Sequence, residues 1–149
     1  MRRSLIEKLS SAGDDALGSM PEYRSINELR DAVTRDLEEL LNTRSEAVRV
    51  LTDAFPECLN SSLTYGIPDF SSTGLLSMPD RDRIRRGLEK AIMLHEKRLH
   101  RVRIIVDPPR EHERALRFRV DAMLDLGSDR EKVQFDAVLQ LNTQVCAVS

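Results

Sequence analysis

The C-terminal third of the chain decides the fold. It contains the run Leu116-Arg117-Phe118-Arg119-Val120-Asp121-Ala122-Met123-Leu124, in which every second residue is apolar. A second alternating run covers residues 133–142, and a shorter one, with Ile105 out of step, covers residues 101–107. Successive side chains of a strand point to opposite faces of a sheet, so each run predicts a strand with one buried and one solvated face. Three such runs in succession predict an antiparallel meander.

Two amphipathic helices are predicted upstream of these strands. Ser25 and Glu28 form a capping box, and the apolar residues after it recur every three or four positions until 42–44. The second helix is expected to begin at 77–80, where a proline and an acid follow a serine, and its apolar stripe continues to Leu99. A weaker helical stretch lies between them and ends at a proline.

The order of these elements predicts an α+β fold, with N-terminal amphipathic helices packed on a C-terminal antiparallel sheet of three to four strands. The 149 residues suffice for one domain, which we place at 25–149. Residues 10–24 are rich in small and polar side chains and predict a flexible linker. The short capped turn 4–9 before it is either a hook that docks on this domain or a partner, or a frayed terminus. Residues 1–24 are therefore set apart as hook and linker.

Composition excludes several classes of protein. The net charge of −2 argues against a dedicated nucleic-acid binder, and no apolar run approaches the roughly 20 residues of a membrane span. Cys58 and Cys146 lie far apart and match no metal-binding spacing. We expect a cytoplasmic protein with no cofactor, no metal, no nucleic acid and no membrane insertion.

The chain lacks the common catalytic motifs. His95 and His100 are five residues apart, whereas a zinc-protease helix needs four, so we interpret His95 as a histidine at the core edge with one hydrogen bond. Paired carboxylates that cleave peptidoglycan remain an alternative, but sugar sites favour aromatic side chains and the chain has no Trp, two Tyr and four Phe. We therefore predict no catalytic residue.

Charge is distributed unevenly along the chain. Residues 79–119 hold 13 Lys and Arg against 7 Asp and Glu, a net of +6, and the remainder has a net of −8. This basic segment is either a protein interface or a solvated face with local acidic partners. Its arginines on the second helix and the first two strands are Arg81, Arg83, Arg85, Arg86, Arg101, Arg103, Arg117 and Arg119.

The last alternating run has few of the residues that keep an edge strand from pairing with another chain. Val133–Leu141 contains no proline, no lysine and a single acid, Asp136. Either residues 143–148 cover this strand, or it accepts a strand from another chain. On the second interpretation Gln134, Asp136 and Gln140 are partner-binding residues.

Three short segments carry a family resemblance. Leu41-Asn42-Thr43-Arg44, Tyr65-Gly66-Ile67-Pro68-Asp69-Phe70 and Glu96-Lys97-Arg98-Leu99 occur in this order around the second helix. Over residues 4–142 the chain resembles the lysozyme-like, GPW-type family of contractile-phage baseplate wedge proteins, to which the TssE baseplate subunits of type VI secretion systems are similar.

The resemblance implies a non-catalytic structural subunit. It would join the wedge of TssF and TssG and start polymerisation of the TssB–TssC sheath by strand exchange, with TssK and the VgrG spike as further neighbours. The partner-binding residues that it implies are Arg44, Tyr65, Gly66, Pro68, Asp69, Glu96, Lys97, Arg98 and Leu99. A peptidoglycan-cleaving hydrolase and an adaptor of an unrelated complex are the competing hypotheses.

All three segments also allow a physical interpretation. Lys97 stands where the family has proline, which permits the helix to continue towards His100, so Glu96 and Arg98 are expected to seek different partners. The loop 65–70 is expected to be stiff, with Asp69 accepting backbone N–H bonds. It either contacts a partner directly or positions the second helix, and Asn42 likewise either stops the first helix or contacts a partner.

Overall fold

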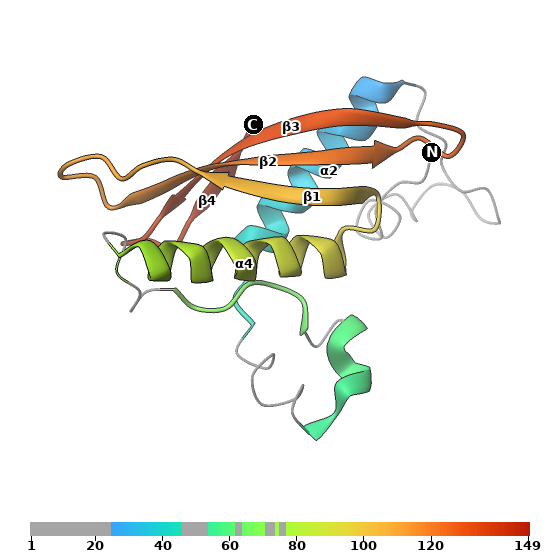
Figure 1. The fold of residues 1–149 in the computed structure, drawn as a ribbon. Coiled ribbons are helices and arrows are strands. Elements are labelled where there is room, and N and C mark those ends of the chain that lie inside the picture. Colours follow the sequence, from blue (N-terminus) through green and yellow to red (C-terminus); the bar gives the residue numbers. More distant parts are fainter. Residues whose placement is uncertain (1–24, 46–53, 62–63, 71–73, 75–76) are drawn as a thin grey trace, which may run out of the picture.

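The computed structural model describes residues 25–45, 54–61, 64–70, 74 and 77–149. Within them a four-stranded antiparallel sheet of order β1-β2-β3-β4 packs with two long helices (Figure 1). In chain order the elements are α2 (Ile26–Asn42), the short 3₁₀ helix η1 (Pro56–Asn60), α4 (Met78–His95), β1 (Leu99–Val106), β2 (Ala115–Asp125), β3 (Arg130–Gln140) and β4 (Cys146–Val148). The predicted α+β fold is confirmed. The predicted hook, the linker and most of the weaker helical stretch lie outside the described residues.

Helix α2 begins and ends where the sequence predicts. The Ser25 hydroxyl accepts a hydrogen bond from the Glu28 N–H at 3.3 Å, which satisfies one of the unpaired donors of the first turn. The helix ends at Asn42, and Thr43 leaves it in an extended conformation. Its buried stripe consists of Leu29, Ala32, Val33, Leu37, Leu40 and Leu41.

Helix α4 begins at the predicted place but ends earlier than expected. Met78 follows the N-cap Ser77, although the Ser77 side chain forms no capping bond. The helix stops at His95, and Glu96 has non-helical angles of φ −108° and ψ 88°. The expectation that Lys97 lets the helix run on towards His100 is therefore wrong, and Leu99 opens β1 instead.

The sheet is regular between its two central strands and irregular at one edge. β2 and β3 pair without interruption from Ala115–Gln140 to Asp125–Arg130. In β1 the register shifts between His100 and Arg103, which is a β-bulge. β4 adds three residues to the far side of β3.

One face of the sheet forms the core with both helices. The alternate residues Phe118, Val120, Phe135 and Leu139 are at most 3% exposed, as the period-2 pattern predicts. α4 runs along the sheet beside β1, and α2 crosses behind the strands (Figure 1). No helix among the described residues is long and apolar enough to cross a membrane.

Candidate protein-interaction site

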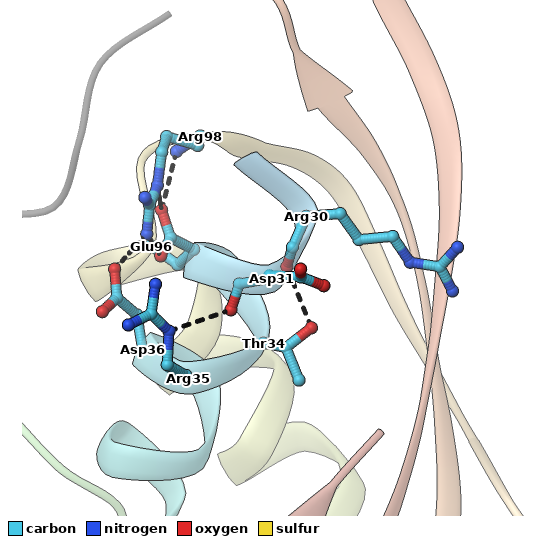
Figure 2. Close-up of polar contacts among 7 residues, drawn as sticks. All are labelled: Arg30, Asp31, Thr34, Arg35, Asp36, Glu96 and Arg98. Carbon is cyan, nitrogen blue, oxygen red and sulfur yellow. Dashed lines mark hydrogen bonds and ion pairs between the residues drawn. The ribbon is translucent and has the colours of Figure 1, made fainter. Parts of the chain in front are cut away.

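A buried ion cluster joins the end of α4 to the start of β1. The Arg98 Nε donates to Glu96 Oε1 at 2.7 Å, and its Nη2 donates to Glu96 Oε2 at 2.5 Å. The same Nη2 also pairs with the Asp36 carboxylate of α2, so Arg98 lies between two carboxylates (Figure 2). The exposed fractions of these side chains are 13% for Arg98, 8% for Glu96 and 19% for Asp36. We call this group the charge clamp.

Electrostatics holds the clamp in its charged form. Burial by itself lowers the pKa of Arg98, but hydrogen bonds and charge interactions with Glu96 and Asp36 outweigh burial and raise it. The Glu96 carboxylate also accepts the Arg98 backbone N–H at 3.1 Å, which closes the turn between helix and strand. Arg98 therefore fixes the direction in which the chain enters β1.

The expectation that Glu96 and Arg98 seek different partners is thus wrong. Because the helix ends at His95, the two residues lie on a turn, where positions two apart can meet. Lys97 between them is exposed, and Leu99 is buried in the core. Of this predicted partner-binding segment, Lys97 has the exposure that a direct contact requires.

Tyr65 and His95 lie next to the clamp. Their rings meet edge to face with centroids 5.3 Å apart, and the His95 Nε2 is 3.0 Å from the Thr64 carbonyl oxygen. Burial raises the pKa of Tyr65 to about 12, helped by the nearby carboxylates of Glu39, Asp36 and Glu96. The prediction that His95 is a core-edge histidine with one hydrogen bond is confirmed.

A second polar cluster fixes β4, and it is neutral at its centre. The Asn42 Oδ1 accepts the Cys146 N–H at 2.7 Å, and the Asn42 Nδ2 donates to the Cys146 carbonyl oxygen at 2.9 Å. A side-chain amide carries the same donor and acceptor as a peptide unit, so Asn42 occupies the outer edge of β4 as a neighbouring strand would. We call Asn42, Arg44, Gln144 and Cys146 the amide latch.

Gln144 of the latch is bound on one side by Arg44, also of the latch, and on the other side by Asp69. The Arg44 Nε donates to Gln144 Oε1 at 2.9 Å, and Gln144 Nε2 donates to Asp69 Oδ1 at 3.1 Å. Burial lowers the pKa of Arg44, while Asp69 acts in the opposite direction. Gln144 has a positive φ of 56°, a turn conformation that these bonds hold in place.

The loop 65–70 is a structural partner of the segment that follows α2. Ile67 accepts from the Ser45 N–H and donates to the Thr43 carbonyl, at 3.0 and 2.9 Å, as a short parallel bridge. Gly66 has φ +120°, and a Cβ there would be 2.6 Å from the Thr43 oxygen. Pro68 is half-buried beside the bridge. These contacts give the loop a structural role at the end of α2, and its predicted roles, positioning the second helix or contacting a partner, stay predictions.

The C-terminal half of the predicted open edge of β3 is covered by the chain itself. Asp136 exchanges backbone hydrogen bonds with Ser149, and the Gln140 N–H donates to the Val145 carbonyl at 2.8 Å. The interpretation that this stretch accepts a foreign strand is wrong for Asp136 and Gln140, because residues 145–149 already occupy it. Beyond β4, the Gln134 carbonyl accepts from the Arg30 guanidinium at 3.2 Å, and Arg30 extends from α2 towards the strands (Figure 2).

The opposite edge of the sheet is more open. β1 pairs with β2 on its inner side, and no strand of the described residues pairs with its outer side. One outward N–H, that of Ile104, donates to the Glu89 carboxylate of α4 at 2.9 Å. Glu89 is in turn bound by Arg85 at 2.9 Å.

Four of the eight arginines named above for the basic segment have local acidic partners, as one of the two interpretations proposed. Arg85 and Arg86 pair with Asp82, Arg117 pairs with Glu113, and Arg119 pairs with Asp136 on the outer face of the sheet. Arg101 and Arg103, on the open edge, are exposed and form no ion pair within the described residues.

Sequence reasoning did not anticipate the roles of Asp36, Glu89 and Gln144. Asp36 and Glu89 lie on polar helix faces, and their partners are 62 and 15 positions away. No local spacing marks such pairs. For Gln144 the sequence does carry a signal. It follows the polar pair Asn142-Thr143 and precedes the apolar run 145–148, a pattern that is typical of a turn leading into a strand.

The fold and its polar clusters define a class of protein: a small α+β domain whose sheet has one edge occupied along the C-terminal half of β3 and the other edge capped at Ile104 by the side chain of Glu89. The family model of the baseplate wedge protein gp25 matches residues 27–128, more than half of the chain. The chain therefore belongs to the baseplate wedge protein gp25 family, which makes it a structural component of a baseplate.

Comparison with solved structures supports the same fold. A chain of the structure titled "The baseplate complex from the type VI secretion system" is similar with a TM-score of 0.52 and 17% sequence identity, and the match covers 76% of this chain and 96% of that chain. No curated protein matches the sequence. The family match points to a structural role rather than to peptidoglycan cleavage.

Proposed function

We propose that this protein is a TssE-type subunit of the cytoplasmic baseplate of a type VI secretion system. In this role it docks into the wedge of TssF and TssG and starts assembly of the TssB–TssC sheath, near TssK and the VgrG spike. Membership of the gp25 family and the fold shared with a type VI secretion baseplate chain support the assignment.

The observation that carries the sheath-initiating role is the open edge of β1. An edge strand presents unpaired N–H and C=O groups that can template another strand. The Asp107 N–H donates to the Arg117 carbonyl, so the alternation of an antiparallel ladder turns the N–H groups of Ile104 and Val106 outward. We assign the acceptor edge to β1 in place of β3, whose C-terminal half is occupied.

The first test is co-purification with TssF and TssG of the same organism, followed by counting sheaths in cells that carry fluorescent TssB. The parent protein is expected to bind the wedge and to support sheaths. Failure to bind the wedge would contradict the baseplate role. Clearing of cell walls by the purified protein would instead support the hydrolase.

The second test separates docking from sheath initiation. Val106→Pro removes an outward donor that no described residue uses, so wedge binding should persist while sheath number falls at least tenfold. Asp107→Pro, which removes a donor bound by Arg117, is the control for damage to the ladder itself. Normal sheath numbers with folded Val106→Pro would show that β1 is not the acceptor.

A further inference from the structure

The open edge of β1 carries positive charge that the described part of the chain does not neutralise. Arg101 and Arg103 are exposed and have no ion-pair partner among the described residues, whereas Arg85, Arg117 and Arg119 each have a carboxylate partner within 3.1 Å. Exposed charges on one short edge segment favour an acidic molecule by charge complementarity. The positive charge of this edge therefore favours a partner segment that carries carboxylates.

The backbone at Arg101 supports a role in binding. Arg101 has φ 52° at the bulge of β1. Left-handed backbone is unfavourable for a residue with a Cβ, and glycine is the residue that usually occupies such a bulge position. The chain retains a long charged side chain where glycine would fit with less strain, which is the kind of outlier that marks functional positions.

The nearest carboxylate in register does not neutralise Arg103. Asp121 lies directly opposite Arg103 in the β1–β2 ladder, yet the two form no ion pair. The Asp121 Oδ1 is buried and has no hydrogen-bond partner in the part of the chain that the structure describes. The Arg103 guanidinium is thus available to a carboxylate from outside.

The same edge has one protected donor and an apolar rim. The Glu89 carboxylate caps the Ile104 N–H, so it occupies the place that a carbonyl oxygen of an added strand would take. Ile105 is 46% exposed, and Met93, one turn after Glu89 on α4, is 59% exposed. The same Glu89 Oε1 also accepts from Arg85 at 2.9 Å, so a carboxylate that releases Ile104 still has a cationic partner on its own helix.

We propose that the β1 edge binds an extended, acidic segment of a partner protein, whose carboxylates pair with Arg101 and Arg103 while a backbone carbonyl displaces Glu89 from the Ile104 N–H. This inference rests on the assignment of β1 as the acceptor edge in the proposed function, and adds the chemistry of the partner. A single-stranded nucleic acid is disfavoured, because it binds through a platform of stacking aromatics and β1 has no Phe, Tyr or Trp.

The test uses the full chain, labelled with ¹⁵N, and two synthetic ten-residue peptides of alternating Thr and Val. One peptide carries Asp at two of the Thr positions, and the other carries Lys at the same positions. The acidic peptide should shift the amide signals of Ile104 and Val106 and bind at least tenfold more tightly than the basic one. Arg101→Gly combined with Arg103→Ser should abolish that preference, since each exposed ion pair contributes roughly fivefold or less.

Two further variants test the cap and the strain. Glu89→Ala should tighten binding of the acidic peptide, whereas Glu113→Ala, which removes a carboxylate that pairs with Arg117 but caps no strand, should not change it. Arg101→Gly alone should leave the protein at least as stable as the parent while it weakens binding of the acidic peptide. A purely structural role of Arg101 does not produce this combination.

Three outcomes would overturn the proposal: equal affinity for the two peptides, no binding of either, or shifts confined to other strands. Displacement of the acidic peptide by an oligouridylate that shifts the same amides would favour nucleic acid instead. If the peptide binds as expected but the wedge and sheath assays fail, the proposed function is wrong and this edge preference stands. If Val106→Pro abolishes sheaths but neither peptide binds, the acidic preference is wrong.

Discussion

The two edge strands of the sheet are both tied to α2, but by different chemistry. At the start of β1 the tie is ionic, with Arg98 buried between Glu96 and Asp36. At β4 the contact to the strand is neutral, with the Asn42 amide bound to both backbone groups of Cys146. Removing a partner from a buried charge group leaves uncompensated charge, whereas removing an amide leaves one polar backbone unit that water can reach. The clamp should therefore be the more sensitive of the two.

The largest expected effect follows from breaking the clamp. Arg98→Ala leaves Glu96 and Asp36 buried without their shared cation, which should lower the free energy of unfolding by about 3–5 kcal/mol. Urea denaturation measures the loss. Lys97→Ala, at the exposed residue between the clamp partners, is the control and should change stability by less than about 0.5 kcal/mol.

A small effect of Arg98→Ala, below about 1 kcal/mol, would show that the clamp carries little stability. Should the alanine variant not fold, Arg98→Lys offers the same comparison. It keeps the charge but loses the planar fork that reaches both carboxylates, so an intermediate loss is expected.

The next largest effect is expected where Gly66 packs against Thr43, the residue that follows α2. Gly66→Ala places a Cβ 2.6 Å from the Thr43 oxygen at φ +120°, and we expect a loss of about 2–3 kcal/mol. Gly127→Ala is the matched control, because Gly127 also has a positive φ but nothing lies within 4 Å of its added Cβ. The difference between the two variants in thermal unfolding isolates the close approach. Equal losses would mean that backbone strain, and not this contact, dominates.

Opening the latch itself should have a smaller effect. Asn42→Ala removes two hydrogen bonds to Cys146, with an expected loss of about 1–2 kcal/mol. Burial raises the pKa of the Cys146 thiol to about 12, so this thiol should react slowly with iodoacetamide at pH 8.

In Asn42→Ala the alkylation of Cys146 should accelerate at least tenfold, with the half-buried Cys58 as internal control. Peptide mapping by mass spectrometry separates the two sites. An unchanged rate at Cys146 would mean that β4 stays in place without Asn42.

The smallest expected effect is a pH dependence next to the clamp. Burial lowers the pKa of His95 below 6.5, and Lys97 adds to this shift. The unfolded chain then binds its proton at higher pH than the folded chain, so the contribution is full above about pH 6.5 and is lost as the pH falls through the folded pKa. His95→Gln keeps a donor for the Thr64 carbonyl and should remove this dependence in thermal melts between pH 5 and 7. Identical profiles for parent and variant would contradict it.

The features of the fold that could be predicted from the sequence are those that depend on neighbouring residues. The alternation in 116–124, the Ser25–Glu28 cap and the start of α4 depend on neighbouring residues, and the structure confirms each. The end of α4 was predicted wrongly, because the turn at Glu96 depends on a contact with Arg98 and on Asp36, 62 positions from Arg98. The role of β4 was left open, since three residues give no clear period. Arg44, Gly66 and Asp69 were predicted to bind a partner, which stays a prediction, and their contacts within the chain were not predicted because those depend on residues distant in sequence.

The side chain of Asn42 has a consequence for engineering monomeric β proteins. Natural sheets prevent edge-to-edge pairing with lysines or prolines placed on the outermost strand, and designs can do the same. Here a single carboxamide, on the last residue of a helix, terminates hydrogen bonding at one edge residue, Cys146, and adds no charge to the strand. Transplanting this helix-borne terminator onto an aggregation-prone scaffold offers a route to solubility that alters no residue of the strand it protects.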